Sequence, residues 1–370
     1  MKNTLGTSVL TTVFGESHGQ AVGAIVDGLP AGLLVDTDFI EKQLAKRRPS
    51  SKIDTPRQEM DNYQILSGVF EGRTTGTPIC IVIPNENTKS KDYSSTKSLA
   101  RPSHADYTAQ CKYHGYQDYR GGGHFSGRVT AGIVGVGAIA IKALENLGIK
   151  LGTHILKCGG ACDLEFSTDF DKLEKEIDSI ADKKFPVISD VEDKMTEKIL
   201  EAREQGDSIG GVIQTAIYNM PCGVGEPWFD TMESVLSHAV FSIGGIKGIE
   251  FGKGFGFADL MGSEANDELE IKNGKVITKT NNNAGINGGI TNSMPIIFNC
   301  AVKPTPSIAK EQSTIDFEAK ENARIAIKGR HDPAIIRRIC VVVDSIVALT
   351  LCDMLAQRYG TDVFTKGIRE

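Results

Sequence analysis

Short apolar runs rich in β-branched residues recur along the chain and predict strands. Each run is bounded by turn-forming residues and is shorter than an ordinary helix. Because β-branched side chains pack well on a pleated surface, such runs are typical of buried strands. The four predicted strands are Val22–Val26, Ile79–Ile83, Val212–Tyr218 and Pro295–Val302.

Two stretches between these strands predict helices. In LLVDTDFIEKQLAKRRPS, a side-chain oxygen of Asp36 or Thr37 can cap the first backbone N–H groups, and the helix must stop before Pro49. The stretch VTAGIVGVGAIAIKALENLG is apolar on nearly every face, and Gly148 ends it. The second helix is therefore expected to be buried.

Charged stretches predict two exposed helices, around Asp169–Asp182 and Val191–Gln205. A last helix is expected after Asp332 and Pro333, because an N-cap residue followed by proline in the first turn is a common start of a helix. Strands alternate with helices along the chain, which indicates a mixed α/β architecture.

An internal similarity suggests a duplicated unit. GAIVDGLPAGLLVDTDFIEKQL and GVIQTAIYNMPCGVGEPWFDTMESVL share the order strand, Pro-x-Gly, spacer, Asp-Thr, helix, although two copies alone leave chance open. No shift in composition divides the chain. We predict an α+β/α/β fold, a single large domain over residues 1–370, built as a β-α layered sandwich with internally duplicated β-α units. Two long polar stretches, about 84–104 and 281–292, are expected to be functional loops.

Composition excludes several classes of function. Hydrophobic residues at 40% and charged residues at 24% are typical of a folded soluble protein. A net charge of -6 and a pI near 5.8 argue against nucleic-acid binding, so an anionic ligand must be met by a local basic pocket. The N-terminus has no signal-peptide pattern, and Asp344 and Asp353 interrupt the apolar C-terminal run, so no membrane span is expected.

Eight cysteines are scattered without paired metal-ligand spacing, which is typical of small buried residues in a reducing cytoplasm. The chain has seven histidines, and four of them lie in turn-prone segments beside Gly, Ser, Arg or Asp: His18, His104, His124 and His331. A lone histidine is usually structural, but four in such settings favour an acid/base site. None has a metal-ligand spacing, so no metal is expected.

Arginines lie beside these histidines and at turns: Arg47, Arg48, Arg101, Arg120, Arg128 and Arg330. Each alone is more often a solvated surface charge. A guanidinium can also hold a phosphate or carboxylate at two points, so together they predict a small substrate with several negative charges.

The glycines of YRGGGHFSGRVTAG let backbone donors and the start of a helix approach an anion closely. A glycine-rich turn needed only for close packing is the alternative, and neither nucleotide-binding glycine pattern fits. KPTPS, at Lys303–Ser307, offers a second contact for an anion.

In order along the chain, the segments FGESHG, KRRPSS, ILSGVFEGRTTGTPI, DYSSTKSLARPSHADYT, YRGGGHFSGR, SIGGIKGIEFG, GSEANDE, NAGINGGI, KPTPSI and KGRHDP resemble the signature blocks of the chorismate synthase family. The resemblance spans residues from about 10 to about 335. It implies the chorismate synthase fold and the anti-1,4-elimination of phosphate from 5-enolpyruvylshikimate-3-phosphate, which gives chorismate in the shikimate pathway of aromatic amino acid biosynthesis. Members of the family need reduced FMN although the reaction has no net redox change.

The resemblance also implies roles for residues. His18 matches the histidine held to protonate the reduced flavin, His104 the general acid for the leaving phosphate, and Asp332 the aspartate that assists removal of the ring proton. Ser17 and Ser126 match serines placed with these groups. The matched substrate-binding residues are Arg47, Arg48, Arg101, Arg128 and Arg330, and the matched flavin-binding residues are His124, Phe125, Ser126, Gly244, Gly245, Gly288, Lys303, Pro304, Thr305, Pro306, Ser307 and Arg330.

Three segments depart from the common family pattern. His124 and Phe125 stand where many members have Arg-Ser, SIGG replaces SINA, and Ile53 replaces a basic residue. The resemblance further implies a homotetramer, and we expect it to be cytoplasmic. The sequence leaves open whether the chain reduces its own flavin with NADP(H), as bifunctional members do, or depends on an external flavin reductase; we expect the second, because no added reductase domain is seen. A flavin reductase and a non-catalytic anion-binding flavoprotein are the alternative functions.

Overall fold

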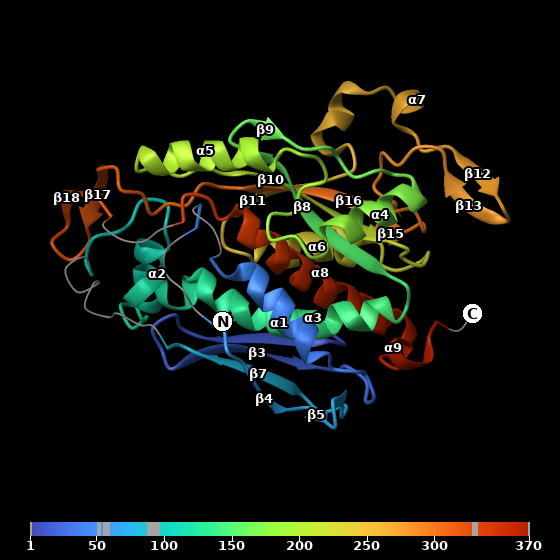
Figure 1. Cartoon of the computed structure of the whole chain (residues 1–370), viewed down its shortest axis with the longest axis horizontal. Coiled ribbons are helices and arrows are strands. Elements are labelled where there is room, and N and C mark those ends of the chain that lie inside the picture. Colours follow the sequence, from blue (N-terminus) through green and yellow to red (C-terminus); the bar gives the residue numbers. More distant parts are fainter. Residues whose placement is uncertain (1, 50–52, 55–59, 87–96, 328–331, 369–370) are drawn as a thin grey trace.

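Two five-stranded antiparallel sheets enclose a layer of long helices (Figure 1). The computed structural model describes residues 2–49, 53–54, 60–86, 97–327 and 332–368. The first sheet has the order β1-β2-β3-β7-β4 and the second β11-β16-β10-β8-β9. In the first sheet the strands are β1 (Thr4–Leu5), β2 (Leu10–Gly15), β3 (Ala21–Asp27), β7 (Ile79–Pro84) and β4 (Gln64–Ser67). In the second they are β11 (Ile246–Phe251), β16 (Ile296–Val302), β10 (Gly211–Tyr218), β8 (Lys150–Cys158) and β9 (Ala161–Cys162).

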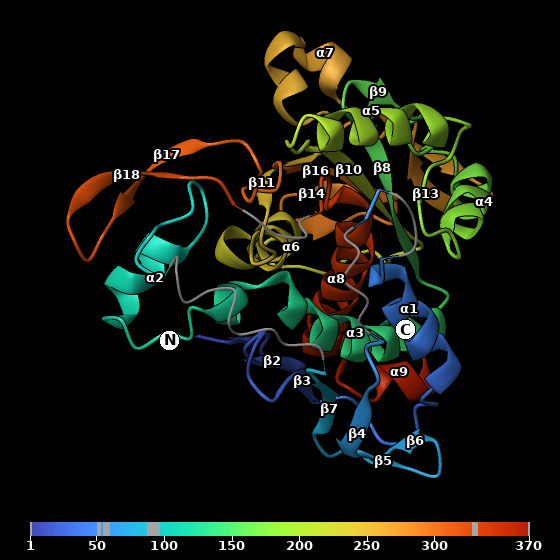
Figure 2. The same cartoon turned by 60° about the vertical axis from the view of Figure 1, so that its left-hand side comes forward.

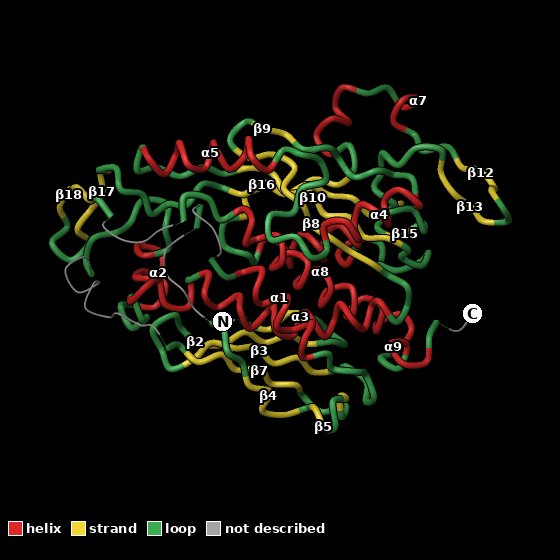
Figure 3. Tube along the Cα trace, viewed as in Figure 1, coloured by secondary structure: helices red, strands yellow, loops and turns green. Residues whose placement is uncertain are grey.

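The middle layer consists of α1 (Thr37–Arg47), α3 (Thr130–Glu145), α6 (Met232–Phe241) and α8 (Ile336–Tyr359). Helix α3 packs on β3 and β7 of one sheet, α8 packs on β8 and β10 of the other, and the two helices pack on each other. Two more helices, α4 (Phe170–Ile180) and α5 (Glu192–Glu204), lie outside the second sheet, so helices, in red in Figure 3, cover both of its faces.

Small residues allow this close packing. A Cβ added to Gly137 of α3 would lie 2.4 Å from the Cβ of Ser345 in α8, and one added to Gly132 would lie 2.4 Å from the backbone of Gly23 in β3. The segment Gly127–Glu145 and helix α8 are long and apolar enough to cross a membrane, but 78% and 94% of their apolar windows are buried inside the protein. They therefore form its core.

Short elements surround the sandwich. They are β5 (Val69–Phe70), β6 (Arg73–Thr74), α2 (Asp106–Tyr113), α7 (Gly262–Ala265), β12 (Leu269–Lys272), β13 (Lys275–Thr278), β14 (Ile286–Asn287), β15 (Ile290–Thr291), β17 (Gln312–Asp316), β18 (Glu321–Ile325) and α9 (Val363–Lys366). Figure 2 shows the β17–β18 hairpin beside α2, where Ala100 N–H donates to Ile315 O at 3.2 Å.

Most of the predicted elements are present. The four predicted strands correspond to β3, β7, β10 and β16. Helix α1 begins at Thr37, and the carboxylate of Asp36 accepts the N–H of Phe39 at 2.9 Å, as the capping pattern predicted. The buried helix is α3, although it ends at Glu145, before Gly148.

Two expectations were wrong in detail. Helices α4 and α5 are amphipathic rather than simply exposed, because α4 buries Leu173 and Ile177 and α5 buries Met195 and Ile199. Helix α8 begins at Ile336 with Ile335 as its N-cap, so Asp332 does not cap it and Pro333 lies before its first turn. The carboxylate of Asp332 pairs instead with Arg338.

The two similar segments do occupy equivalent places, because β3 and β10 are the central strands of their sheets and each is followed by a helix of the middle layer. The caps differ: Asp36 caps α1, whereas Thr231 caps α6 by accepting the N–H of Ser234 at 3.0 Å. The duplication therefore stays a prediction.

The predicted loop 84–104 is described only at its ends. The loop 281–292 contains the β14–β15 hairpin, and Asp267 holds it by accepting the N–H groups of Asn282 and Asn283 at 2.7 and 2.8 Å. One hydrophobic cluster extends from Val9 to Phe364, and on this basis we propose that residues 1–370 form one domain.

Candidate active site

The glycine run lies between two of the predicted histidines. Gly121, Gly122 and Gly123 all have positive φ, at 60°, 87° and 52°, a conformation that favours glycine. A Cβ on Gly121 would lie 2.2 Å from His18 Cε1, and one on Gly122 would lie 3.2 Å from His104 Cε1. The run is therefore needed for packing, and that packing brings both histidines to one place.

The segment that carries His18 is tied to the glycine run. Ser17 N–H donates to Gly123 O at 3.1 Å, and Ser17 Oγ lies 3.2 Å from the carbonyl oxygens of both Arg120 and Gly121. Ser17 Oγ also lies 3.0 Å from His18 Nδ1. Both side chains are buried, so the serine fixes the plane of the imidazole ring.

His104 is held by a carboxylate that the sequence analysis did not identify. Its Nδ1 lies 2.9 Å from Asp106 Oδ1, and Arg101 binds the same carboxylate with Nε at 2.7 Å and Nη2 at 2.7 Å. Burial raises the pKa of Asp106, but the hydrogen bonds from Arg101 and His104 outweigh burial and hold it well below its usual range. The guanidinium of Arg101 is therefore bound by Asp106.

A second carboxylate joins two of the predicted substrate arginines. Asp61 pairs with Arg47 at 3.3 Å and with Arg128, and its side chain is only 3% exposed. Arg47 Nη2 also donates to Gly127 O at 2.9 Å, and Arg128 Nε donates to Asn85 Oδ1 at 3.0 Å. These two guanidiniums connect α1, the glycine run and the end of β7.

Two polar atoms near these groups lack partners among the described residues. They are Arg48 Nε and Thr305 Oγ1, and both atoms are buried. An unpaired buried donor is costly, so such atoms commonly mark the place of a ligand or a water molecule. Both residues belong to the predicted binding set.

Two of the predicted flavin segments lie beside the segment that carries His104. Lys303 Nζ donates to Ser103 O at 2.7 Å, next to His104, and Lys303 N–H donates to Gly245 O at 2.9 Å. Burial, and then the charge of Lys247, lower the pKa of Lys303. Residues 303–307, Gly244 and Gly245 therefore lie together.

The remaining predicted flavin residues lie in two places, His124 to Ser126 directly after the glycine run and Gly288 in the β14–β15 turn. His124 Nδ1 lies 2.8 Å from Gly15 O, the ring of Phe125 packs edge-on against Tyr113, and Ser126 Oγ accepts Arg128 N–H at 3.3 Å. Gly288 lies in the β14–β15 turn, where neighbouring Gly289 O accepts the N–H of Met232, at the opposite end of α6 from Gly244.

Asp332 is positioned by the start of α8. Arg338 pairs with Asp332 and donates from Nε to Arg47 O at 2.6 Å, while Arg337 donates to Lys46 O at 3.1 Å and to Arg48 O at 3.2 Å. These guanidiniums satisfy the last carbonyl groups of α1. Arg330 and His331 lie outside the described residues.

Sequence reasoning missed the two carboxylates, Asp61 and Asp106, as well as Arg338. A signal existed for Asp106, which follows His104 by two residues inside RPSHADYT. Asp61 differs from an ordinary aspartate by its positive φ of 52°, and that angle cannot be read from the sequence. Among the described residues, no group of three or more His, Cys, Asp or Glu could hold a metal ion.

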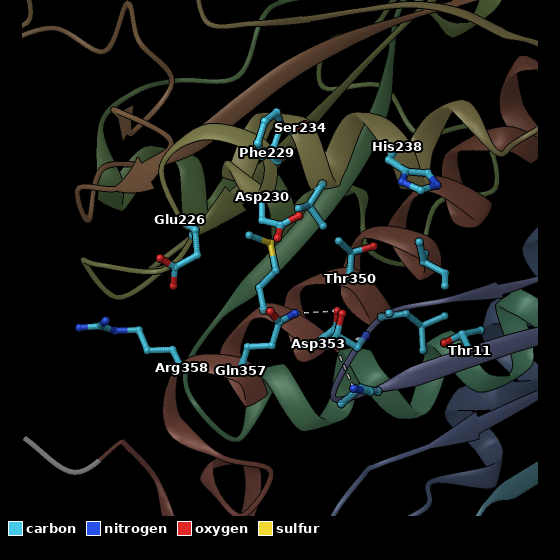
Figure 4. Close-up of a pocket in the computed structure, with 18 of the residues that line it drawn as sticks. Thr11, Glu226, Phe229, Asp230, Ser234, His238, Thr350, Asp353, Gln357 and Arg358 are labelled. Atoms are coloured by element: carbon cyan, nitrogen blue, oxygen red, sulfur yellow. Dashed lines mark hydrogen bonds between the residues drawn. The ribbon is translucent and has the colours of Figure 1, made fainter.

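The two described cavities are not lined by His18, His104 or the glycine run. A cavity of about 200 Å³ lies between the N-terminal loop, α6 and the end of α8 (Figure 4). Its Asp353 Oδ1 accepts N–H groups from Thr7, Ser8 and Val9 at 2.9, 2.6 and 2.8 Å, so this carboxylate holds the N-terminal loop. The second cavity, about 100 Å³, is lined by Lys46, Arg337 and Asp344.

Known proteins resemble this chain over nearly its whole length. A family model described as chorismate synthase matches residues 9–356. The chain is 46% identical over 366 residues to the chorismate synthase of Methanocaldococcus jannaschii, covering 96% of each chain. It is 46% identical over 356 residues to that of Methanobrevibacter smithii, covering 95% of this chain and 96% of the relative.

A solved structure gives the same result. A crystal structure of chorismate synthase matches with a TM-score of 0.76 at 28% sequence identity, covering 96% of this chain and 94% of that one. The family model, the relatives and the shared fold together establish that the chain belongs to the chorismate synthase family.

Proposed function

We propose that the cluster around the glycine run performs the reaction of this family, the anti-1,4-elimination of phosphate from 5-enolpyruvylshikimate-3-phosphate to give chorismate. The chain is a lyase by its family. The observation that supports this site is the position of Gly121 and Gly122, which lie against His18 and His104 respectively. Both proposed acid/base groups thus lie at one glycine-rich turn, where they can act on the same bound ligand.

His104 is proposed to give the leaving phosphate its proton. Because Asp106 binds Nδ1, the ring edge carrying Nε2 faces Gly122, where an added Cβ would lie 3.5 Å from Nε2. Nε2 is therefore the atom that transfers the proton to a phosphate oxygen. His18, oriented by Ser17 and placed with Ser126 at the glycine run, is the second proton-transfer group.

The substrate carries a phosphate and two carboxylates, and the pocket must supply donors for them. Arg48 is the best-placed arginine, because its Nε is buried and has no partner in the described part of the chain. The guanidiniums of Arg47, Arg101 and Arg128 bind Asp61 or Asp106, so we propose that they shape the pocket and supply its positive potential. Arg330 completes the proposed set.

The residues at positions 303–307 and at Gly244 and Gly245, which lie beside the segment that carries His104, fit reduced FMN. Thr305 Oγ1 is buried without a partner among the described residues and is suited to a ligand oxygen, and Lys303, two positions earlier, adds a positive charge to the segment. The proposed contacts are His124, Phe125, Ser126, Gly244, Gly245, Gly288, Arg330 and residues 303–307. When bound, the reduced flavin supplies a transient electron for the elimination.

Asp332 is proposed to assist removal of the ring proton. Arg338 holds its carboxylate, and the same guanidinium binds Arg47 O at the end of α1. This arrangement links the proposed base rigidly to the helix end that carries Arg48.

Assembly and location complete the proposal. Trp228 and Phe229 are 85% and 88% exposed in the single chain, which supports a homotetramer in which such side chains are covered. All eight cysteines are free, which fits a reducing cytoplasm. We propose that an external reductase supplies the reduced flavin.

The test is an anaerobic assay of the purified protein with chemically reduced FMN and 5-enolpyruvylshikimate-3-phosphate, with and without NADPH. Release of phosphate and chorismate is expected with reduced FMN alone. Oxidation of NADPH without release of phosphate would identify a flavin reductase instead. Binding of both ligands without turnover, unchanged in His104→Ala, would identify a non-catalytic flavoprotein.

A further inference from the structure

The carboxylate of Asp106 accepts hydrogen bonds from every side. Oδ2 accepts Arg101 N–H at 2.9 Å and Arg101 Nε–H at 2.7 Å. Oδ1 accepts Arg101 Nη2–H at 2.7 Å and lies 2.9 Å from His104 Nδ1. An ionised carboxylate has about four acceptor sites, so these four contacts fill its capacity and fix its orientation.

These contacts decide which nitrogen of His104 carries a proton. Arg101 Nη2 also lies 3.1 Å from His104 Nδ1 and carries a second hydrogen, but Asp106 Oδ1 is closer to Nδ1, at 2.9 Å, and is negatively charged. If Nδ1 were unprotonated, its lone pair would face the lone pairs of the carboxylate. A proton on Nδ1 removes this repulsion and makes a charge-assisted hydrogen bond.

We infer that Asp106 is a positioning residue for the reaction, which fixes the Nδ1–H tautomer of His104 and leaves Nε2 as its one proton-transfer atom. The inference rests on the acid role proposed above for His104. It assigns Arg101 to the same unit, because this guanidinium keeps the carboxylate ionised and in place. The three side chains are partly buried, with 16% of Arg101, 18% of His104 and 20% of Asp106 exposed, so a ligand can reach the unit from solvent.

The proton balance of the step explains why this tautomer matters. Protonated His104 carries protons on both nitrogens and gives the Nε2 proton to a phosphate oxygen of the leaving group. The ring that remains is neutral with its proton on Nδ1, which is the form that Asp106 stabilises. Asp106 thus stabilises the charged acid and also its product, without accepting a proton itself.

The chain holds a matched control for the local geometry. Asp118 binds Arg120 as Asp106 binds Arg101, because it accepts Nε–H at 2.8 Å, Nη2–H at 2.8 Å and the backbone N–H at 3.1 Å. No histidine nitrogen is hydrogen-bonded to Asp118 in the described part of the chain. Asp118→Asn therefore removes an equivalent aspartate–arginine turn without touching His104.

The decisive variant is Asp106→Asn. Its amide oxygen should take the Oδ2 position, which accepts both the backbone N–H and the Nε–H of Arg101. Its NH₂ group then takes the Oδ1 position beside His104 Nδ1 and selects the opposite tautomer. The measurement is ¹⁵N NMR of histidine-labelled full-length protein, with a His104→Gln difference spectrum to assign the ring signals. When the His104 ring is neutral, we expect the Nδ1–H form in the native protein and in Asp118→Asn, and the Nε2–H form in Asp106→Asn.

Kinetics with reduced FMN provide the second measurement. Asp106→Asn should lower kcat by about 10²–10⁴-fold, the range for loss of general acid catalysis, with KM changed less than about threefold. Asp106→Glu should restore the tautomer and part of kcat, and it serves if the asparagine variant does not fold. An Nδ1–H signal or a nearly native kcat in folded Asp106→Asn would overturn the inference.

Different results would refute the acid role of His104 and the positioning role of Asp106. Full activity of a folded His104→Ala variant would remove the acid role, and with it the catalytic importance of Asp106. An Nε2–H tautomer in the native protein would overturn the inference about Asp106 alone, because the proposed acid role of His104 would stand.

Discussion

Gly121 lies so close to His18 that a Cβ at this glycine would come within 2.2 Å of the ring carbon Cε1 and 2.3 Å of Nδ1. Gly121 also has a φ of 60°, which disfavours any residue with a side chain. The closeness of the two residues makes the glycine a direct determinant of where the imidazole ring lies.

Gly121→Ala should therefore displace the His18 ring and strain the turn. We expect loss of stability of about 1–3 kcal/mol, from the left-handed backbone, and a larger proportional loss of kcat. Gly127→Ala is the control, because no atom lies within 4 Å of a Cβ there and its φ is not in the left-handed region. Urea unfolding and the anaerobic assay measure both effects, and equal kcat in the two variants would contradict the prediction.

Gly122 also has a left-handed backbone. Its φ of 87° means that a β-branched residue would strain the backbone as well as any flavin contact. Gly122→Val is therefore expected to lower stability together with FMN affinity, so it does not separate packing from binding.

Asp61 should be important for stability because it balances two buried arginines. Asp61→Asn is expected to destabilise the fold by about 3–5 kcal/mol, since it leaves buried guanidinium charge uncompensated. Asparagine tolerates the left-handed backbone of this position, so the change tests charge. Asp207→Asn, which breaks the exposed pair with Lys310, should cost less than about 1 kcal/mol. Similar midpoints of urea unfolding in the two variants would refute this role.

Arg48 and Arg47 are neighbours with opposite expected behaviour. Arg48→Ala should raise KM for the phosphorylated substrate about 10–100-fold, as for loss of a charge-assisted hydrogen bond, with little change in stability because its Nε has no partner among the described residues. Arg47→Ala should lower stability, because it breaks the pair with Asp61. A native KM in Arg48→Ala would show that the substrate binds elsewhere.

Thr305→Val tests the proposed flavin contact. Removing a buried hydroxyl without a partner should leave stability unchanged or slightly higher, while the Kd for reduced FMN rises about tenfold. Thr74→Val is the matched control, because its hydroxyl donates to Pro30 O at 2.6 Å and accepts Leu33 N–H at 2.9 Å. It should lower the melting temperature without changing flavin affinity, and anaerobic titration measures the difference.

Asp344 makes stability depend on pH. Burial raises its pKa to about 7, Lys46 and Thr153 oppose this only in part, and Oδ1 has no partner in the described part of the chain. An unfolded aspartate titrates near pH 4, at about 3.9, so the unfolded chain loses this proton first as the pH rises. Stability should therefore fall between about pH 4 and pH 7 and stay low above that range.

Asp344→Asn cannot ionise, so it should raise the melting temperature at pH 8 and leave it nearly unchanged at pH 4. Thermal unfolding at the two pH values measures this. A shift of the same size at both would show that ionisation of Asp344 is not the cause.

Local sequence patterns were sufficient to predict many of the strands and helices. The strand runs, the Asp36 cap and the burial of α3 depend on neighbouring residues, so their sequences predicted them. The start of α8 did not follow the capping pattern, because the carboxylate of Asp332 pairs with Arg338 in the first turn of the helix instead of accepting backbone N–H groups.

The sequence by itself determined the family, most of the elements and the residue types of the site, because these are properties of short ordered blocks. Only the tertiary structure decided which charges meet. Asp61 lies 67 positions from Arg128, and Arg338, which pairs with Asp332, lies 291 positions from Arg47, whose carbonyl oxygen it binds. Partnerships over such separations depend on how two sheets enclose the helices. The structure alone therefore shows that Asp61 binds Arg47 and Arg128, while Arg48 keeps a donor without a partner among the described residues.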